Sequence, residues 1–344
     1  MNGGKIIGIA LMVLMIILGA CTKNQEEENL PESTEVVVVL NNLSETYSYY
    51  MPESNDTIID VDTTGSVPND ILIYGDYAYI VNSGFGGVPS LMKIDLLGDT
   101  IVKYTVFPSG SNPWAIIKKE NSLFVSCTGN DMVYKLDLYT LRFLDSVKVG
   151  KGPEGMTEKD GRIYVACTGY DLSNYSYNNA YVYTVEEGPA GLYVSDSVYA
   201  GVNTQSVAIA SDTLYALSTG DYSNTFGKLY LYEIGDTFRF VDTINVGQSP
   251  GYMYYYNNAL YLTDWYGGVC KVSTQDREVI WQNTGEGTSQ IAIDMNGRGF
   301  ITRFNGSGPN YLLLFDPERV QVYDSVYMGE QKGIQGLGIW MKTQ

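Results

Sequence analysis

The sequence contains no histidine among its 344 residues. This absence excludes Ser-His-Asp triads, Cys-His nucleophiles, His-containing zinc or iron sites and haem pockets with an axial histidine. Basic residues are also scarce, because 21 Lys and Arg stand against 39 Asp and Glu, giving a net charge of −18. Nucleic-acid binding depends on clustered Lys and Arg, so we expect no nucleic-acid partner. A cation or an uncharged polar molecule is compatible with this composition.

Cysteines and long apolar runs are few as well. Three of the four cysteines, Cys127, Cys167 and Cys270, lie in the body of the chain. An odd number predicts no disulfide framework, and we expect these three to be small buried apolar residues. The apolar run Ile6–Leu18 is shorter than the about 20 residues that a transmembrane helix needs.

The N-terminus has the pattern of a signal peptide. Lys5 precedes the apolar run, and Leu18-Gly19-Ala20-Cys21 follows it, which predicts cleavage after residue 20. This tetrapeptide resembles a bacterial lipobox, and the resemblance implies that Cys21 is lipidated and anchors the mature chain to a membrane. An uncleaved anchor or a plain secretory signal is the alternative.

Residues 21–34 read as a polar tether between the anchor and the folded domain. The run Glu26–Glu28 and Pro31 lie in this stretch. An acidic stretch just after a lipidated cysteine resembles the surface-export signal of Bacteroidetes lipoproteins, which implies an outer-membrane lipoprotein at the cell surface. A solvated linker on the periplasmic face is the alternative. We therefore expect a signal peptide over 1–20, a tether over 21–34 and a folded domain over 35–344.

The body of the chain repeats itself at intervals of 39 to 51 residues. Each unit has a buried-strand aromatic, which we call the anchor: Tyr79, Phe124, Tyr164, Tyr215, Tyr261 and Phe300. Eleven residues before each anchor stands what we call the register residue: Pro68, Pro113, Pro153, Thr204, Pro250 or Ser289. A second marker is an Asp-Ser/Thr-Val/Ile triplet that we expect to open a strand, at Asp56, Asp99, Asp145, Asp196, Asp242 and Asp324.

Periods near 40 residues with short apolar strands and glycine turns are typical of four-stranded propeller blades. Six complete units leave strands at both ends of the chain. Near the N-terminus these are residues 35–40, 46–51 and 57–61, and near the C-terminus the segment around Gln335–Trp340 resembles an innermost strand. Pairing the two ends would remove the unpaired sheet edges. The sequence therefore predicts an all-β, seven-bladed β-propeller closed by N-terminal strands plus one C-terminal strand.

Three segments of one unit, Asn112–Ile116, Leu123–Cys127 and Met132–Asp137, resemble the YVTN, or YncE-like, propeller repeat. The resemblance covers most of residues 35–344 and implies the propeller fold, but that family hosts several activities. Similar propellers of Bacteroidetes include surface lipoproteins that capture cobalamin for an outer-membrane TonB-dependent transporter. The resemblance thus makes a corrinoid one candidate ligand.

The residue after each register residue is expected at the mouth of the central channel, and we call it the rim residue. The rim residues are Asn69, Trp114, Glu154, Gln205, Gly251, Gln290 and Gln335, and Tyr252 beside Gly251 completes the expected ring. Neighbouring loops add Tyr170, Asp264, Trp265, Arg303 and Phe304. Amides that donate and accept hydrogen bonds, beside aromatic rings, suit a small polar ligand. Alternatively, the rim side chains bond only to water and to neighbouring blades.

These observations favour a cell-envelope lipoprotein that captures a small polar ligand and passes it to a transporter. A protein-interaction scaffold of the envelope is the first alternative, and a metal-dependent lactonase or lyase is the second. No catalytic residue, cofactor or metal-ligand set is expected, because no nucleophile motif, phosphate loop or calcium loop is recognisable in the sequence.

Overall fold

The computed structural model describes residues 33–343 except 172, 285 and 286. The predicted signal peptide, Cys21 and nearly all of the predicted tether lie outside these residues. All regular structure in the described part is β-strand and turn. No helix long and apolar enough to cross a membrane was found in residues 33–343.

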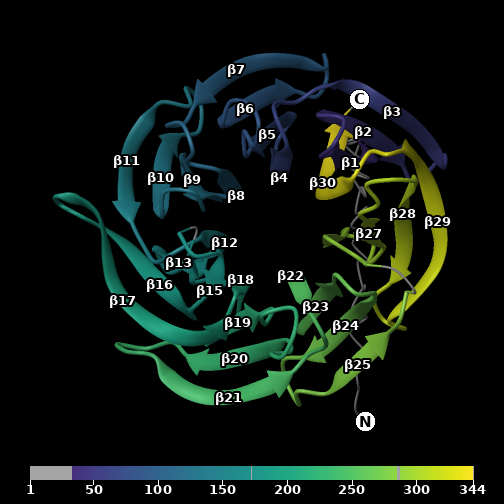
Figure 1. The fold of residues 1–344 in the computed structure, drawn as a ribbon. Helices are drawn as coiled ribbons and strands as arrows, with labels where there is room; N and C mark the ends of the chain where they lie inside the picture. The colour runs from purple at the N-terminus through teal and green to yellow at the C-terminus, as the bar shows by residue number, and fades with distance from the viewer. Residues whose placement is uncertain (1–32, 172, 285–286, 344) are drawn as a thin grey trace, which may run out of the picture. The chain divides into compact units, whose positions relative to one another are not determined.

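The described chain forms seven four-stranded antiparallel sheets arranged as the blades of a ring (Figure 1). The first three consecutive blades contain β4 (Pro68–Tyr74), β5 (Tyr77–Asn82), β6 (Ser90–Asp95) and β7 (Thr100–Val106); β8 (Pro113–Lys119), β9 (Ser122–Cys127), β10 (Met132–Asp137) and β11 (Phe143–Lys148); and β12 (Pro153–Lys159), β13 (Arg162–Cys167), β16 (Asn179–Gly188) and β17 (Gly191–Val202). The next three contain β18 (Thr204–Ala210), β19 (Thr213–Ser218), β20 (Lys228–Glu233) and β21 (Arg239–Asn245); β22 (Pro250–Tyr256), β23 (Ala259–Asp264), β24 (Gly268–Ser273) and β25 (Val279–Gln282); and β26 (Ile291–Ile293), β27 (Gly299–Arg303), β28 (Pro309–Asp316) and β29 (Gln321–Glu330).

The seventh blade joins the two ends of the described chain and confirms the predicted closure. Its strand order is β3 (Asp56–Thr63), β2 (Thr46–Met51), β1 (Ser33–Asn41) and β30 (Ile334–Thr343). Strand β1 pairs antiparallel with β30, with Val36 opposite Trp340, and Figure 1 shows yellow β30 beside purple β1. Strand β1 begins two residues before the predicted domain start at 35.

The register residues mark where the inner strands begin. Strands β4, β8, β12, β18 and β22 each start on one, and in each the ladder with the next strand shifts register directly after it. Such a β-bulge leaves a residue unpaired and redirects its side chain. The preceding residue has positive φ in four of these blades: Val67, Asn112, Gly152 and Asn203. The bulge thus explains why the rim residues leave the ladder.

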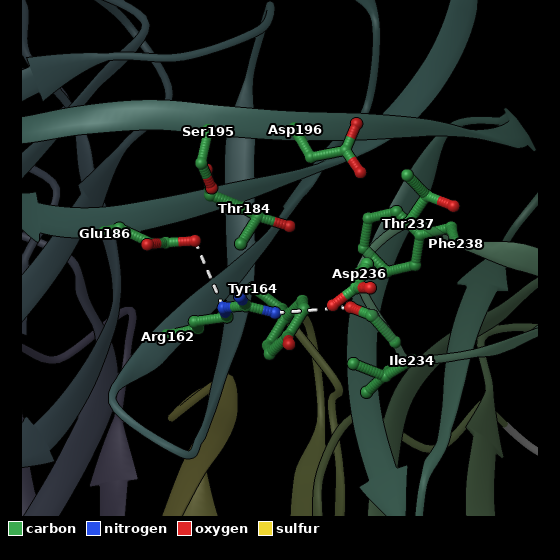
Figure 2. Close-up of a pocket in the computed structure, with 11 residues that line it drawn as sticks. Arg162, Tyr164, Thr184, Glu186, Ser195, Asp196, Ile234, Asp236, Thr237 and Phe238 are labelled. Carbon is green, nitrogen blue, oxygen red and sulfur yellow. Dashed lines mark hydrogen bonds and ion pairs between the residues drawn. The ribbon is translucent and has the colours of Figure 1, made fainter.

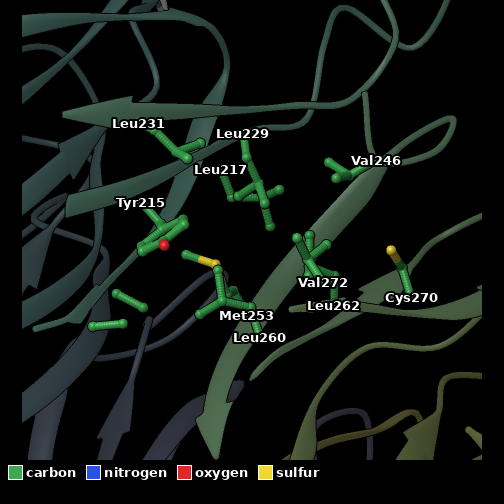
Figure 3. Close-up of a cluster of buried hydrophobic side chains, with 12 residues drawn as sticks. Tyr215, Leu217, Leu229, Leu231, Val246, Met253, Leu260, Leu262, Cys270 and Val272 are labelled. Atoms are coloured by element: carbon green, nitrogen blue, oxygen red, sulfur yellow. The ribbon is translucent and has the colours of Figure 1, made fainter. Parts of the chain in front are cut away.

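The six predicted anchor aromatics are all buried, at no more than 3% exposure. They lie in the second strand of each blade and pack between neighbouring blades. One such cluster joins the β18–β21 and β22–β25 blades, where Leu229, Met253 and Leu262 pack together (Figure 3). Cys127, Cys167 and Cys270 are buried and free, as predicted.

The prediction that the Asp triplets open a strand is right at β3, and at β7, where Asp99 directly precedes the strand, but wrong elsewhere. Asp145, Asp196, Asp242 and Asp324 lie inside the outer strands β11, β17, β21 and β29. The pairing of each strand with its neighbour shifts register at that point. The carboxylate accepts a bond from the next backbone N–H, as from Ser146 to Asp145 at 2.7 Å. The triplet therefore marks an outer-strand bulge, beside which the aspartate accepts a bond from the backbone N–H that follows it.

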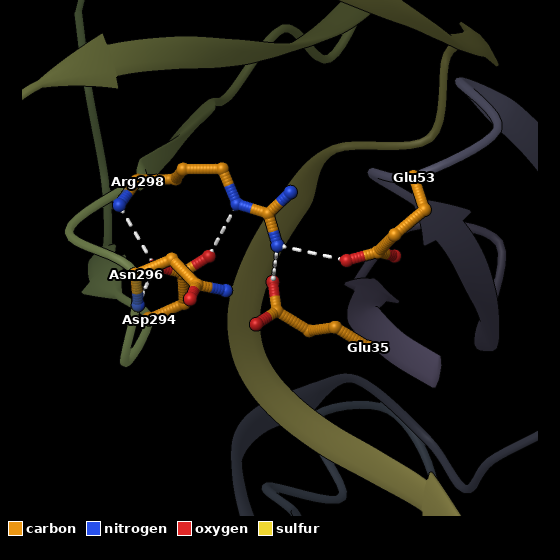
Figure 4. Close-up of polar contacts among 5 residues, drawn as sticks. All are labelled: Glu35, Glu53, Asp294, Asn296 and Arg298. Atoms are coloured by element: carbon orange, nitrogen blue, oxygen red, sulfur yellow. Dashed lines mark hydrogen bonds and ion pairs between the residues drawn. The ribbon is translucent and has the colours of Figure 1, made fainter. Parts of the chain in front are cut away.

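An ion-pair cluster crosses the seam between the closing blade and its neighbour (Figure 4). Arg298, in the turn before β27, donates to Asp294 at 2.5 Å, to Glu35 of β1 at 2.9 Å and to Glu53 at 3.0 Å. Glu35 and the Asp294 carboxylate are almost fully buried. Burial and the nearby Asp294 raise the pKa of Glu35 to about 7, whereas Arg298 helps keep the pKa of Asp294 below its usual range.

Candidate functional site

The rim residues meet around one cavity at the channel mouth, with a volume of about 70 Å³. The cavity is lined by all seven of them, Asn69, Trp114, Glu154, Gln205, Gly251, Gln290 and Gln335, and by the predicted Tyr252 and Trp265. Asn69, Trp114, Glu154, Gln205 and Gln335 lie at bulges that remove them from the β-ladder, whereas Gln290 directly precedes its strand. The structure therefore assembles residues from all seven blades at one place.

Some rim amides are occupied in joining blades. Asn69 donates to the Pro113 carbonyl of the next blade at 2.9 Å, and Gln290 accepts from the Leu337 N–H at 3.0 Å. Gln205 donates to the Tyr222 hydroxyl at 3.0 Å. Asn69 and Gln290 therefore bond to neighbouring blades, as the alternative interpretation of the rim expects, and these bonds help to hold the ring together.

Two carboxyl groups face the same cavity in different surroundings. Asp70 accepts backbone N–H bonds from Ile71 at 2.9 Å and Ile116 at 3.1 Å, yet burial raises its pKa to about 6. The Glu154 carboxyl makes no hydrogen bond to any described residue, and burial alone raises its pKa to about 8. Glu154 is therefore largely protonated at neutral pH, and it is the mouth carboxyl that lacks a protein partner.

A tryptophan takes the place of the missing rim side chain at Gly251. A Cβ atom at Gly251 would lie 2.2 Å from the indole nitrogen of Trp265, so only glycine leaves room for this ring. The Trp265 Nε1 is buried and has no hydrogen-bond partner among the described residues. An unpaired buried donor is costly, so this N–H is a local cost of packing Trp265 against Gly251.

A larger cavity of about 310 Å³ adjoins the first, and both are lined by Trp114 and Glu154. Its far side is formed by Tyr170 and Tyr177, which pair across a short hairpin of β14 (Tyr170–Asp171) and β15 (Ser176–Tyr177). Their ring centroids are 4.9 Å apart, and Tyr222 continues the aromatic group at 6.0 Å from Tyr177. We call these three residues the tyrosine shelf.

Three predicted site residues do not line either cavity. Asp264 is buried and joins its own loop to the segment before β22, accepting N–H bonds from Tyr266 and from Gln248 and Ser249. Arg303 lies over the ring of Tyr311 at 5.9 Å, and Phe304 lies next to Leu43 and Gly333. Asp264 and Arg303 are the last residues of β23 and β27 and not loop residues, and the direction of these three side chains depends on hydrogen bonds and packing that a repeat alignment does not show.

Asp70 and Ser206 line the central cavity and Tyr177 lines the adjoining one, and none of the three is among the predicted site residues. The first two follow a rim residue directly. Tyr252 was predicted at the equivalent place in its own blade. The same offset applied to every blade would have found Asp70 and Ser206.

A separate cavity of about 240 Å³ lies between two blades on the other face of the ring (Figure 2). Arg162, at the start of β13, pairs there with Glu186 at 3.1 Å and donates to the Gly235 carbonyl at 3.4 Å. The mouth lies at the opposite end of β13, so these residues contribute nothing to it. In residues 33–343, apart from the three that are not described, no group of three or more Cys, Asp or Glu side chains is arranged to hold a metal ion.

Comparison with known proteins establishes the fold. No protein-family model matches the sequence, and no curated protein matches it. A protein from Bacteroides uniformis that is provisionally assigned as a 6-phosphogluconolactonase is similar in structure, with 10% identity and a TM-score of 0.67 over 89% of this chain and 99% of that chain. A Bacteroides fragilis protein with the same provisional assignment has 11% identity and a TM-score of 0.60, over 89% and 98%.

A chain in a nidogen/laminin complex is also similar, with 12% identity and a TM-score of 0.53 over 90% of this chain and 100% of that chain. Identities this low support a shared fold and no shared activity. The chain is therefore a seven-bladed β-propeller with lactonase-type and protein-binding propellers among its structural neighbours. Its resemblance to YncE-like repeats stays a prediction.

Proposed function

We propose that this protein captures a small polar ligand at the channel mouth and passes it to an outer-membrane transporter of the TonB-dependent class. The observation that carries the proposal is the gathering of rim residues from all seven blades around one cavity, where the Glu154 carboxyl has no protein partner. A ligand with a hydrogen-bonding group at this place would bond to Glu154 and to the rim amides. The aromatic rings around them would bury its apolar faces.

The envelope location is part of this proposal and rests on the sequence around Cys21. We propose an outer-membrane lipoprotein exposed at the cell surface, held by lipid on Cys21 and set apart by the acidic tether. Replacing Cys21 with Ser should move the protein from the membrane fraction to the soluble fraction. Protease treatment of intact cells then separates surface display from attachment on the periplasmic face.

A corrinoid remains a candidate ligand, because its many peripheral amides complement the amides of the rim. The central cavity of about 70 Å³ holds only a small group. A corrinoid would therefore lie across the mouth and insert a side group, whereas a smaller ligand could enter the joined cavities.

Calorimetric and spectral titration of the purified protein with cobinamide and cobalamin tests the corrinoid. Trp114→Ala and Glu154→Ala should each weaken binding of any ligand held at the mouth. Matched controls are Trp281→Ala on outer strand β25 and Glu158→Ala on the exposed part of β12, which should leave binding unchanged. Equal binding by both mouth variants and both controls would refute the mouth assignment.

A protein-interaction scaffold is the second candidate, favoured by one surface feature. Outer strand β7 exposes Ile101, Val102, Tyr104 and Val106, each at more than 40% exposure. Apolar side chains grouped on an edge strand are typical of pairing or docking surfaces. Recovery of a stoichiometric protein partner in a pull-down, without any bound small molecule, would favour the scaffold over ligand capture.

A further inference from the structure

Glu154 lies where the two mouth cavities meet, and it is the carboxyl they share. No Lys or Arg lines either cavity. The neighbouring Lys151 is already paired with Asp131 at 3.1 Å. A ligand that reaches both cavities must therefore pass a carboxyl that no protein cation neutralises.

The remaining titratable groups around Glu154 carry no positive charge. Asp70 and Tyr252 line the central cavity with it, Tyr170 and Tyr177 line the adjoining one, and Cys167 and Tyr222 are close enough for Glu154 to affect their pKa. Asp70 is held by backbone N–H groups. Only an incoming cation can compensate an ionised Glu154.

We propose that Glu154 binds a protonated amine of the ligand while the tyrosine shelf holds a hydroxylated ring, so that the ligand class is an amino sugar. This inference rests on the proposed capture function and specifies its ligand. An ammonium group would form a charge-assisted hydrogen bond with Glu154 and lie beside the indole of Trp114, which favours cations.

The adjoining cavity has the chemistry that a sugar ring needs. Tyr170 and Tyr177 offer aromatic faces, and Asn112, Thr128 and Thr168 offer donors and acceptors for hydroxyl groups. Its volume of about 310 Å³ is at the lower end of the roughly 300–1,000 Å³ range of small-ligand pockets. A monosaccharide fits this arrangement when its amine faces Glu154 and its ring lies in the adjoining cavity.

Binding of an ammonium group should also expel a proton. Burial raises the pKa of Glu154 to about 8, so the free protein holds this carboxyl protonated near neutral pH. An ammonium ion stabilises the ionised form, and the displaced proton goes to buffer. Proton release is a signal that a merely structural role for Glu154 would not produce.

Titration calorimetry with glucosamine, glucose and N-acetylglucosamine, in two buffers of different ionisation enthalpy at about pH 6.5, tests the inference. We expect glucosamine to bind about tenfold tighter than the two neutral sugars and to release close to one proton. Glu154→Gln should abolish both the preference and the proton release, whereas the control Glu158→Gln should keep them.

Equal affinity for the three sugars, or no glucosamine binding at millimolar concentration, would overturn the amine assignment. Those outcomes leave the capture function in place if cobinamide or cobalamin binds and Trp114→Ala weakens that binding. Thermal unfolding of Glu154→Gln checks that loss of binding does not reflect loss of the fold.

Discussion

At the residue scale, Glu154 differs from other carboxylates of the mouth-side loops because it lacks compensating donors. Asp221 accepts N–H bonds from Ser223, Asn224 and Thr225, which lower its pKa. Asp264 likewise holds backbone groups of its loop. A structural role in their loops accounts for these two aspartates. Glu154, in contrast, makes no hydrogen bond to a described neighbour through its carboxyl.

The raised pKa of Glu154 predicts a pH-dependent effect on stability. The folded protein holds the proton up to about pH 8, whereas the unfolded chain releases it near the ordinary value of 4.5. The free energy of unfolding therefore falls as the pH rises between these values. Glu154→Gln should be nearly neutral at about pH 4.5 and should stabilise by roughly 1–3 kcal/mol at about pH 8.5, allowing for partial exposure.

Denaturant unfolding of both proteins at the two pH values measures this difference. A gain of the same size at both values would show that Glu154 titrates normally in the fold.

The identity of the rim residues could be predicted from sequence because it follows from the repeat alone. The hydrogen-bonding state of each rim side chain could not. Asn69 is satisfied by a carbonyl of the next blade, and the place of Trp265 depends on space left by Gly251. The Asn69 bond and the position of Trp265 both depend on residues of another blade or another strand. The repeat pattern does not show which residues these are.

At the element scale, four of the inner strands, β4, β8, β12 and β18, start with a left-handed residue, a register residue and a bulge. Val67 adopts φ of 57° directly before Pro68, although a β-branched residue is strongly disfavoured there. The equivalent residues in other blades are Asn112, Gly152 and Asn203, which tolerate this conformation better.

Relieving that strain should stabilise the protein. Val67→Asn is expected to raise the free energy of unfolding by about 0.5–1 kcal/mol. Val67→Thr keeps the β-branch and should give no gain. Thermal and denaturant unfolding of the two variants compare them, and equal effects would show that backbone strain at this residue is not the cause.

The hairpin β14–β15 shows where prediction from the repeat ends. The sequence predicted a loop at Tyr170. Pairing of Tyr170 with Tyr177 instead makes a short two-stranded sheet that carries two residues of the tyrosine shelf. An insertion has no counterpart in the other blades, so the period that predicts the blades is silent about it.

At the scale of the whole molecule, the ring depends on closure between the β26–β29 blade and the blade made from both ends of the described chain. At six seams a side chain donates to a backbone carbonyl at or just before the inner strand of the next blade, as Thr302 does to Gln335 at 2.8 Å. The Arg298 cluster adds buried charge at the closing seam (Figure 4).

Removing Arg298 should weaken this seam strongly. Arg298→Ala leaves Asp294 and Glu35 buried without their cation, and such losses cost about 2–4 kcal/mol when the pair is partly exposed. The matched control Arg319→Ala removes an exposed arginine of the same blade from Asp316 at 3.6 Å and should cost about 0.5 kcal/mol or less. Denaturant unfolding compares them, and similar losses would show that closure does not depend on this cluster.

A crystal structure of the protein with glucosamine or cobinamide, whichever binds more tightly, tests the central claim most directly. The account predicts the ligand at the channel mouth, in contact with Glu154 and Trp114. A ligand seated in the Arg162 cavity on the opposite face, or anywhere else with the mouth empty at saturation, would contradict it.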